Sequence, residues 1–145
     1  QIESTVFNDE GFQQAITDGW VHAPGRVSPT VGWEIISRCH IGMAILRPIG
    51  NYLESYPTKM FEYMAMGLPV IVSDFELYKG VVEKHKCGIC VDPENTKQVT
   101  DAIRYLLSNP NEAKEMGKRG QQATLKYYNW QVELDKLVAF YNKLH

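Results

Sequence analysis

The chain has 145 residues, of which 44% are hydrophobic and 22% are charged, and its net charge is −2. A domain of this size buries roughly two-thirds of the surface that its unfolded chain would expose. The slightly acidic balance gives no basic footprint of the kind that DNA- and RNA-binding proteins carry, so we expect no nucleic-acid partner. No apolar run approaches the roughly 20 residues needed to span a bilayer.

The N-terminal stretch shows neither a first strand nor a glycine-rich fingerprint before Trp20, and the sequence begins at Gln1. We therefore expect residues 1–145 to form one domain of a longer protein, with a first strand and a preceding domain missing. Farther along, short apolar runs alternate with amphipathic segments. They predict strands at residues 21–23, 41–46, 69–75 and 88–93.

Helices are expected between these strands and after the last one. The predicted helices cover residues 29–39, 57–66 and 76–86, one capped by Thr96 and ended by Asn109-Pro110, one at 111–128, and one from about Trp130. Apolar strands separated by helices indicate a parallel sheet covered on both faces. The predicted fold class is therefore α/β, a Rossmann-like doubly wound parallel sheet with additional C-terminal helices that could pack on a neighbouring domain.

Tryptophan and cysteine positions suggest structural roles. We expect Trp20, Trp33 and Trp130 to anchor the core and the docking of helices. Cys87 and Cys90 form a C-x-x-C, but the sequence has no second such pair for zinc. Because free cysteine is among the most buried residue types, burial is the favoured interpretation over redox or metal chemistry.

In an open α/β sheet, ligands bind beyond the carboxyl ends of the strands. Of the loops placed there, only residues 47–58 are long, and this loop leads into a helix whose first amides suit an anion. On a helical wheel the core stripe of that helix holds Met60, Phe61, Met64 and Ala65. Lys59 and Glu62 share the opposite face, and Glu54 precedes them. They are either a solvated pair or part of a site for a ligand that carries hydroxyls around a phosphate.

The run from Glu54 to Phe75, "ESYPTKMFEYMAMGLPVIVSDF", resembles the donor-side segment of the family 4 type of retaining glycosyltransferases. It has the E-x7-E spacing of that family, and "GRV" at 25–27, "CGICVDPEN" at 87–95 and "TKQVTDAIRYLLSNP" at 96–110 follow the family's order. The resemblance implies the C-terminal, donor-binding half of a two-domain GT-B enzyme. Such an enzyme transfers a sugar from a nucleoside-diphosphate sugar to an acceptor.

The resemblance also implies roles for individual residues. Glu62 would bind the ribose hydroxyls, Glu54 would face the transferred sugar, and Lys59 would add positive charge. The backbone of Ser55, Tyr56, Pro57 and Thr58 would hold the diphosphate at the helix start. The resemblance also implies no metal and no cofactor beyond the nucleotide-sugar, and the sequence has no D-x-D to argue otherwise.

Two features depart from the family pattern. Ser55-Tyr56-Pro57 stands where the family commonly has glycines. The family's Arg-x4-Lys pair is absent at Arg26, which is followed at that offset by Val31. We therefore expect the pair, the acceptor site and the catalytic groups in the missing part, and we expect the present segment alone to be inactive.

Other functions stay open at this point. A nucleotide-sugar epimerase of related two-domain fold would use the same donor. A non-catalytic α/β module such as a receiver-like domain would need clustered acids, and only Asp74 and Asp92 stand at strand ends. We expect a cytoplasmic protein with a glycan or lipid-linked acceptor. Lys114, Lys118 and Lys126 are either a solvated helix face or a contact with an anionic membrane.

Overall fold

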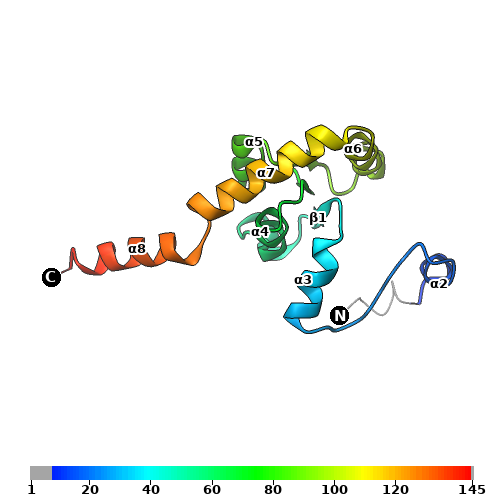
Figure 1. The fold of residues 1–145 in the computed structure, drawn as a ribbon, viewed down its shortest axis with the longest axis horizontal. Helices are drawn as coiled ribbons and strands as arrows, with labels where there is room; N and C mark the ends of the chain where they lie inside the picture. Colours follow the sequence, from blue (N-terminus) through cyan, green and yellow to red (C-terminus); the bar gives the residue numbers. More distant parts are fainter. Residues whose placement is uncertain (1–7, 145) are drawn as a thin grey trace. The chain divides into compact units, whose positions relative to one another are not determined.

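The computed structural model describes residues 8–144, and the chain divides into two compact units, one ending at Ile35 and one beginning at Ile36 (Figure 1). The first unit holds α2 (Glu10–Thr17) and most of α3 (Pro29–Ser37). The Asp9 carboxylate caps α2 by accepting a hydrogen bond from the Phe12 amide at 2.9 Å. The sequence analysis did not predict α2.

The predicted strand at residues 21–23 is wrong, because the chain there closes α2 instead. Gly19 takes a positive φ of 77°, and the amides of Trp20 and Val21 then donate to the Ala15 carbonyl at 2.9 and 3.0 Å. A glycine in this conformation commonly ends a helix in this way. The Val21 amide is therefore already paired and is not available to a neighbouring strand.

The second unit is built on a parallel sheet of three strands in the order β1-β2-β3. The strands are β1 (Gly42–Ala44), β2 (Val70–Ser73) and β3 (Gly88–Val91). Met43 pairs with Ile71, and Ile71 pairs with Ile89. All four residues of β2 are buried, as expected for a central parallel strand covered on both faces.

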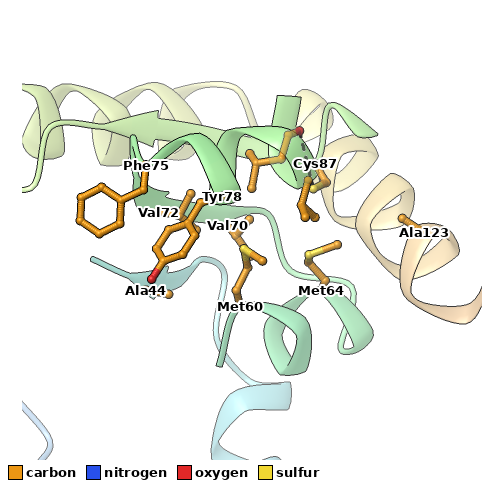
Figure 2. Packing of buried hydrophobic residues seen from close by; sticks show 11 residues of the cluster. Ala44, Met60, Met64, Val70, Val72, Phe75, Tyr78, Cys87 and Ala123 are labelled. Atoms are coloured by element: carbon orange, nitrogen blue, oxygen red, sulfur yellow. Dashed lines mark hydrogen bonds between the residues drawn. The ribbon is translucent and has the colours of Figure 1, made fainter. Parts of the chain in front are cut away.

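Alternate residues of β2 pack into two cores on opposite faces of the sheet. Val70 and Val72 lie in a core with side chains from α4 (Thr58–Ala65), α5 (Glu76–His85) and α7 (Pro110–Tyr127), as Figure 2 shows. Ile71 lies in a second core with Ala102 and Leu106 of α6 (Thr96–Ser108). The predicted doubly wound α/β fold is therefore confirmed.

Gly88 and Gly117 permit close packing in this unit. A Cβ atom on Gly88 would lie 2.0 Å from the Val70 carbonyl oxygen, and one on Gly117 would lie 2.0 Å from that of Gly67. The second contact brings α7 against the turn that follows α4. There the Gln121 side chain donates to the Ala65 carbonyl at 3.0 Å. The C-terminal helices are thus firmly attached to the sheet as far as α7, which runs from α6 past α5 and α4 (Figure 1).

The expected roles of the tryptophans are wrong. Trp20 is 84% exposed, Trp33 is 55% exposed, and Trp130, at the start of α8 (Trp130–Tyr141), is 73% exposed. Large side chains are buried only where a second element offers a matching surface. Among the described residues of the unit that begins at Ile36, no element covers the apolar side chains of α8. These exposed side chains are Leu137, Val138, Phe140 and Tyr141. The packing of α8 on a neighbouring domain stays a prediction.

Smaller corrections concern α6. Its N-cap is Asn95 rather than Thr96, since the Asn95 side chain accepts from the Gln98 amide at 3.1 Å. Leu107, which follows the buried Leu106, is 60% exposed. In residues 8–144 no helix has the length and apolar character that a membrane crossing requires.

Candidate functional site

The loop between β1 and α4 leaves the carboxyl end of the sheet and is anchored to the central strand. The fully buried Ser73 hydroxyl, at the end of β2, accepts from the Leu46 amide at 2.8 Å and donates to the Leu46 carbonyl at 2.7 Å. One side chain therefore satisfies both backbone groups of the residue where the loop begins. This arrangement fixes the direction in which the loop departs from β1.

A second anchor holds the middle of the loop, which forms a short 3₁₀ helix, η1 (Gly50–Leu53). The buried Tyr78 side chain of α5 donates its hydroxyl to the Tyr52 carbonyl at 2.9 Å. Burial, with a smaller effect from Tyr52, raises the pKa of Tyr78 above its usual value, which keeps the hydroxyl protonated as a donor. The loop is therefore held at two points by residues from β2 and α5.

The end of the loop carries Glu54 and Ser55. The Glu54 amide donates to the Asn51 carbonyl at 3.1 Å, and its side chain is exposed to solvent. The Ser55 hydroxyl donates back to the same Asn51 carbonyl at 2.8 Å. The Ser55 hydroxyl proton is therefore used within the loop, and the backbone amide is the group of Ser55 that remains to donate to a ligand.

The start of α4 lacks the usual capping groups. Pro57 is the N-cap, in an extended conformation with φ −73° and ψ 121°, and it makes no side-chain cap hydrogen bond. The first turn of α4 contains no acidic residue. The first helical amides, those of Thr58 and Lys59, have no intrahelical acceptor, and no other described residue accepts from them. The sequence analysis included Pro57 among the backbone groups that hold the diphosphate. Pro57 has no N–H and therefore cannot donate a hydrogen bond.

The predicted charged residues lie on the solvent side of α4. Met60 and Met64 are completely buried, while Lys59 and Glu62 are exposed. The predicted wheel is confirmed for these four residues, but Ala65, which was predicted in the core stripe, is exposed, and Phe61 is half-buried. No ion pair joins Lys59 to Glu62 in the part of the chain that the structure describes, so the solvated pair is not formed. The structure brings Thr58, Lys59 and Glu62 onto one helix, directly after the loop that carries Glu54.

Glu62 acts on its neighbour Tyr63, which fixes α4 against β1. Burial, followed by the nearby Glu62 carboxylate and Cys39, raises the pKa of the Tyr63 hydroxyl. A Cβ atom on Gly42 would lie only 2.3 Å from the Tyr63 ring. The absence of a side chain at Gly42 thus lets α4 lie close to the strand that precedes the loop.

Sequence reasoning missed the residues that hold the loop in place. Ser73 is the one polar residue at the end of an otherwise apolar strand, a pattern that indicates a buried group with a specific hydrogen-bonding task. Tyr78 gave no comparable indication, because its partner is the backbone of a residue 26 positions away.

The two cysteines of the C-x-x-C flank and enter β3. Cys87 is fully buried and Cys90 is half-buried. Burial raises the pKa of the Cys87 thiol to about 11 and that of the Cys90 thiol to about 12. A thiol with so little thiolate at neutral pH is a poor nucleophile and metal ligand, so the pair is best described as part of the core.

A groove of about 210 Å³ lies at the other end of the sheet. It is lined mainly by apolar side chains near the amino ends of β1 and β2, including Ile41, Leu68 and Leu106, with Lys114 at its border. Ligands of open α/β sheets bind at the carboxyl ends, which is where the loop and the start of α4 lie. The groove is therefore not part of the candidate site.

Comparison with known proteins gives a family match. The family model described as "Glycosyl transferases group 1" matches residues 19–123. This range includes the loop, α4 and all three strands. A sucrose-phosphate synthase from Thermosynechococcus elongatus has a similar structure, with a TM-score of 0.75 at 23% identity, over 91% of this chain and 32% of that chain. The second result concerns the fold alone.

Curated relatives agree with the family match. The chain is 33% identical over 84 residues to spore coat protein SA from Bacillus subtilis, covering 57% of this chain and 22% of that protein. It is 29% identical over 94 residues to a GDP-mannose-dependent alpha-(1-6)-phosphatidylinositol monomannoside mannosyltransferase from Mycobacterium tuberculosis, covering 65% of this chain and 24% of that protein. The matched segments thus span less than a quarter of the length of these relatives.

Proposed function

The chain belongs to the group 1 family of glycosyl transferases, and on that premise we propose that it binds the nucleotide-sugar donor of a two-domain enzyme. The enzyme would be of the family 4 type, would transfer a hexose from a nucleoside diphosphate with retention of configuration, and would have this chain as its C-terminal half. The observation that carries the proposal is the uncapped start of α4 at the carboxyl end of the sheet.

The diphosphate is the part of the donor that this helix start suits. The Thr58 and Lys59 amides point out of the first turn, where the helix dipole favours negative charge. The exposed Lys59 ammonium adds a full positive charge nearby. Fixed donors and charges of this kind stabilise the diphosphate as it leaves, because they need no rearrangement during the reaction.

The two glutamates would bind the two ends of the donor. Glu62 lies one helical turn beyond Thr58 and has no cation bound among the described residues, so its carboxylate is available to two ribose hydroxyls. Glu54 lies on the other side of the helix start, at the end of η1, and would face the sugar. A hydrogen bond from a hydroxyl to a charged group contributes about 1.5–3 kcal/mol, more than a hydrogen bond between neutral groups.

The remaining parts of the enzyme lie on the rest of the protein. We assign the acceptor site and the catalytic groups to the other domain and none to this chain. We assign no metal or further cofactor to the donor site, where Lys59 and the helix amides supply the positive charge. The Mycobacterium tuberculosis relative is named for phosphatidylinositol monomannoside, and a relative from Campylobacter jejuni, 26% identical over 112 residues, is named for a diphospho-undecaprenol compound. A lipid-linked or glycan acceptor, reached from the cytoplasmic face of a membrane, is accordingly the acceptor class we propose.

The test is calorimetric titration of the full-length protein with UDP, GDP, ADP and dTDP. We expect one of them to bind, and Glu62→Ala to weaken that binding about ten- to a hundredfold, as expected for the loss of a charged hydrogen-bond partner. Glu83→Ala is the matched control, since Glu83 is also an exposed helical glutamate without an ion pair among the described residues. Equal effects of the two substitutions would refute the ribose role.

Binding of no nucleoside diphosphate and no nucleotide-sugar by the full-length protein would refute the donor site itself. Product analysis then separates transfer from epimerisation. With the correct donor and acceptor, we expect a glycoside with the anomeric configuration of the donor. An isomerised nucleotide-sugar in the absence of any acceptor would instead indicate an epimerase.

A further inference from the structure

A row of aromatic rings extends from the candidate donor loop to the end of α7. The Tyr56 ring meets the Phe61 ring edge-on, with centroids 5.5 Å apart. The Phe61 ring then packs against Tyr128 at 5.1 Å. Tyr56 belongs to the loop, Phe61 to α4, and Tyr128 directly follows α7. Aromatic pairs at these separations are favourable beyond the area that they bury.

The far end of the row is held by a hydrogen bond. The Tyr128 hydroxyl lies 3.0 Å from Nε2 of His85, the last residue of α5. Tyr128 also packs against the buried core that contains Met60 and Met64. Burial raises the pKa of the Tyr128 hydroxyl, with a smaller contribution from Tyr56, so the hydroxyl remains protonated. The Tyr128 ring is therefore held by α5 and by the core, independently of its contact with Phe61.

The near end of the row has few other supports. Tyr56 is 46% exposed. In residues 8–144, no hydrogen bond joins Ser55, Tyr56 or Pro57 to a strand, to α5 or to α7. The Tyr78 anchor acts on Tyr52, before this segment, and the Ser55 hydroxyl bonds only within the loop. The Pro57 carbonyl accepts from the Met60 amide at 3.1 Å within the helix start, and the contact between Tyr56 and Phe61 is the ring contact that ties this segment to the face of α4.

We propose that Phe61 and Tyr128 are positioning residues, which hold Tyr56 and with it the loop-end and first helical amides in the arrangement that receives the diphosphate of the donor. This inference rests on the proposed function. In it, Phe61 and Tyr128 support the site through Tyr56 and do not touch the donor themselves. A misplacement of about 1 Å in a binding group can cost up to a hundredfold in rate, so a support of this kind is measurable.

The experiment compares UDP with UMP, or the corresponding guanosine pair if the protein prefers guanosine, by calorimetry on the full-length protein. Phe61→Leu keeps an apolar side chain but removes the ring between Tyr56 and Tyr128. We expect the affinity for the diphosphate to fall about tenfold, the upper range for an aromatic pair. The affinity for the monophosphate should change less than about twofold. The ratio of the two affinities therefore falls, which a general loss of stability would not cause.

Three further variants complete the test. Phe61→Tyr keeps the ring and should restore the ratio. Tyr128→Leu removes the next ring and should lower the ratio even if Phe61→Leu fails to fold. Tyr105→Leu is the matched control, because Tyr105 is a 47% exposed tyrosine of α6, and among the described residues no ring contact joins it to Tyr56, Phe61 or Tyr128. Its ratio should equal that of the unmodified protein.

The outcomes separate this inference from the proposed function. If the unmodified protein binds none of the nucleoside diphosphates, the donor site is wrong. If it binds one and the ratio is unchanged in both Phe61→Leu and Tyr128→Leu, the donor site stands and the positioning role is refuted. A ratio that falls equally in Tyr105→Leu would also refute it, because the effect would then be a general one.

Discussion

The starts of α4 and α6 follow two strands of the same parallel sheet, yet the chain treats their amides differently. At α6 the Asn95 side chain accepts from the Gln98 amide at 3.1 Å. The Gln98 side chain in turn accepts from the Asp92 amide at 3.0 Å. At α4 the N-cap is Pro57, which makes no such bond. The protein thus satisfies one helix start with its own side chains and leaves the other open.

The start of α5 is intermediate and shows why a free cap alone is a weak indication. Its N-cap, Phe75, also makes no side-chain hydrogen bond, but the first turn carries Glu76. A carboxylate in the first turn complements the helix dipole, so a second anion there would be repelled. Of these three starts, only that of α4 has neither a capping side chain nor a carboxylate, and it alone carries a lysine with no ion pair among the described residues.

Closing the start of α4 should have the largest effect on binding. In Pro57→Asp the new carboxylate can accept from the helix amides as Asn95 does at α6, and it places a negative charge beside the diphosphate. We expect the affinity for the preferred nucleoside diphosphate to fall about a hundredfold, the sum of a lost charged hydrogen bond and a like-charge repulsion. Thermal stability should change little, because a cap gains about 1 kcal/mol and the lost proline costs a similar amount.

The control for this substitution is Asn95→Ala, which opens the start of α6. It should lower the free energy of unfolding by about 1 kcal/mol and leave the affinity unchanged. Calorimetric titration and urea unfolding of both variants measure the two quantities. Unchanged affinity in Pro57→Asp would mean that the amides of α4 do not bind the donor.

Removing a single amide should have a smaller effect. Proline is well tolerated at the first position of a helix, so Thr58→Pro deletes one N–H while the helix stays intact. We expect the affinity for the nucleoside diphosphate to fall about tenfold, as for one hydrogen bond to a charged group. Thr96→Pro makes the same change at the first position of α6. Its affinity should equal that of the unmodified protein, and an equal loss in both variants would remove the distinction between the two helix starts.

Much of the sheet could be predicted from sequence because its strands are encoded locally. The residues of β2 are all buried, and an apolar run between helices is the pattern of a central parallel strand. The faces of α4 were predictable for the same reason, since Met60 and Met64 recur at helical spacing. The ends of the strands were less predictable, because the hydrogen-bonded pairing of one strand stops where its partner strand stops.

The errors concern features that depend on a partner elsewhere in the chain. Residues 21–23 have strand-forming composition, but the Val21 amide is taken by Ala15 through a turn at Gly19. Trp20 and Trp130 have the size of core residues but no described surface to pack on. The supports of the loop between β1 and α4 were missed for the same reason: Ser73 and Leu46 are 27 positions apart. A sequence shows which side chains are apolar, but not which backbone groups lie beside them.

The smallest expected effect is a pH dependence of the free energy of unfolding. It arises at His85, the titratable group at the end of the aromatic row that includes Phe61 of α4. Burial, and then the nearby Lys84, lower the pKa of His85 in the folded state. The unfolded chain therefore binds this proton more readily, so the free energy of unfolding should decrease as the pH falls through the usual histidine range near 6.5. In His85→Gln, which can still bond to Tyr128 but does not titrate, the loss between pH 7 and pH 5 in urea unfolding should be smaller. Asn95→Ala, which alters the α6 side, should show the same loss as the unmodified protein. If His85→Gln also loses as much stability as the unmodified protein, then His85 does not couple the aromatic row to pH, and the two helix starts differ only in how they are capped.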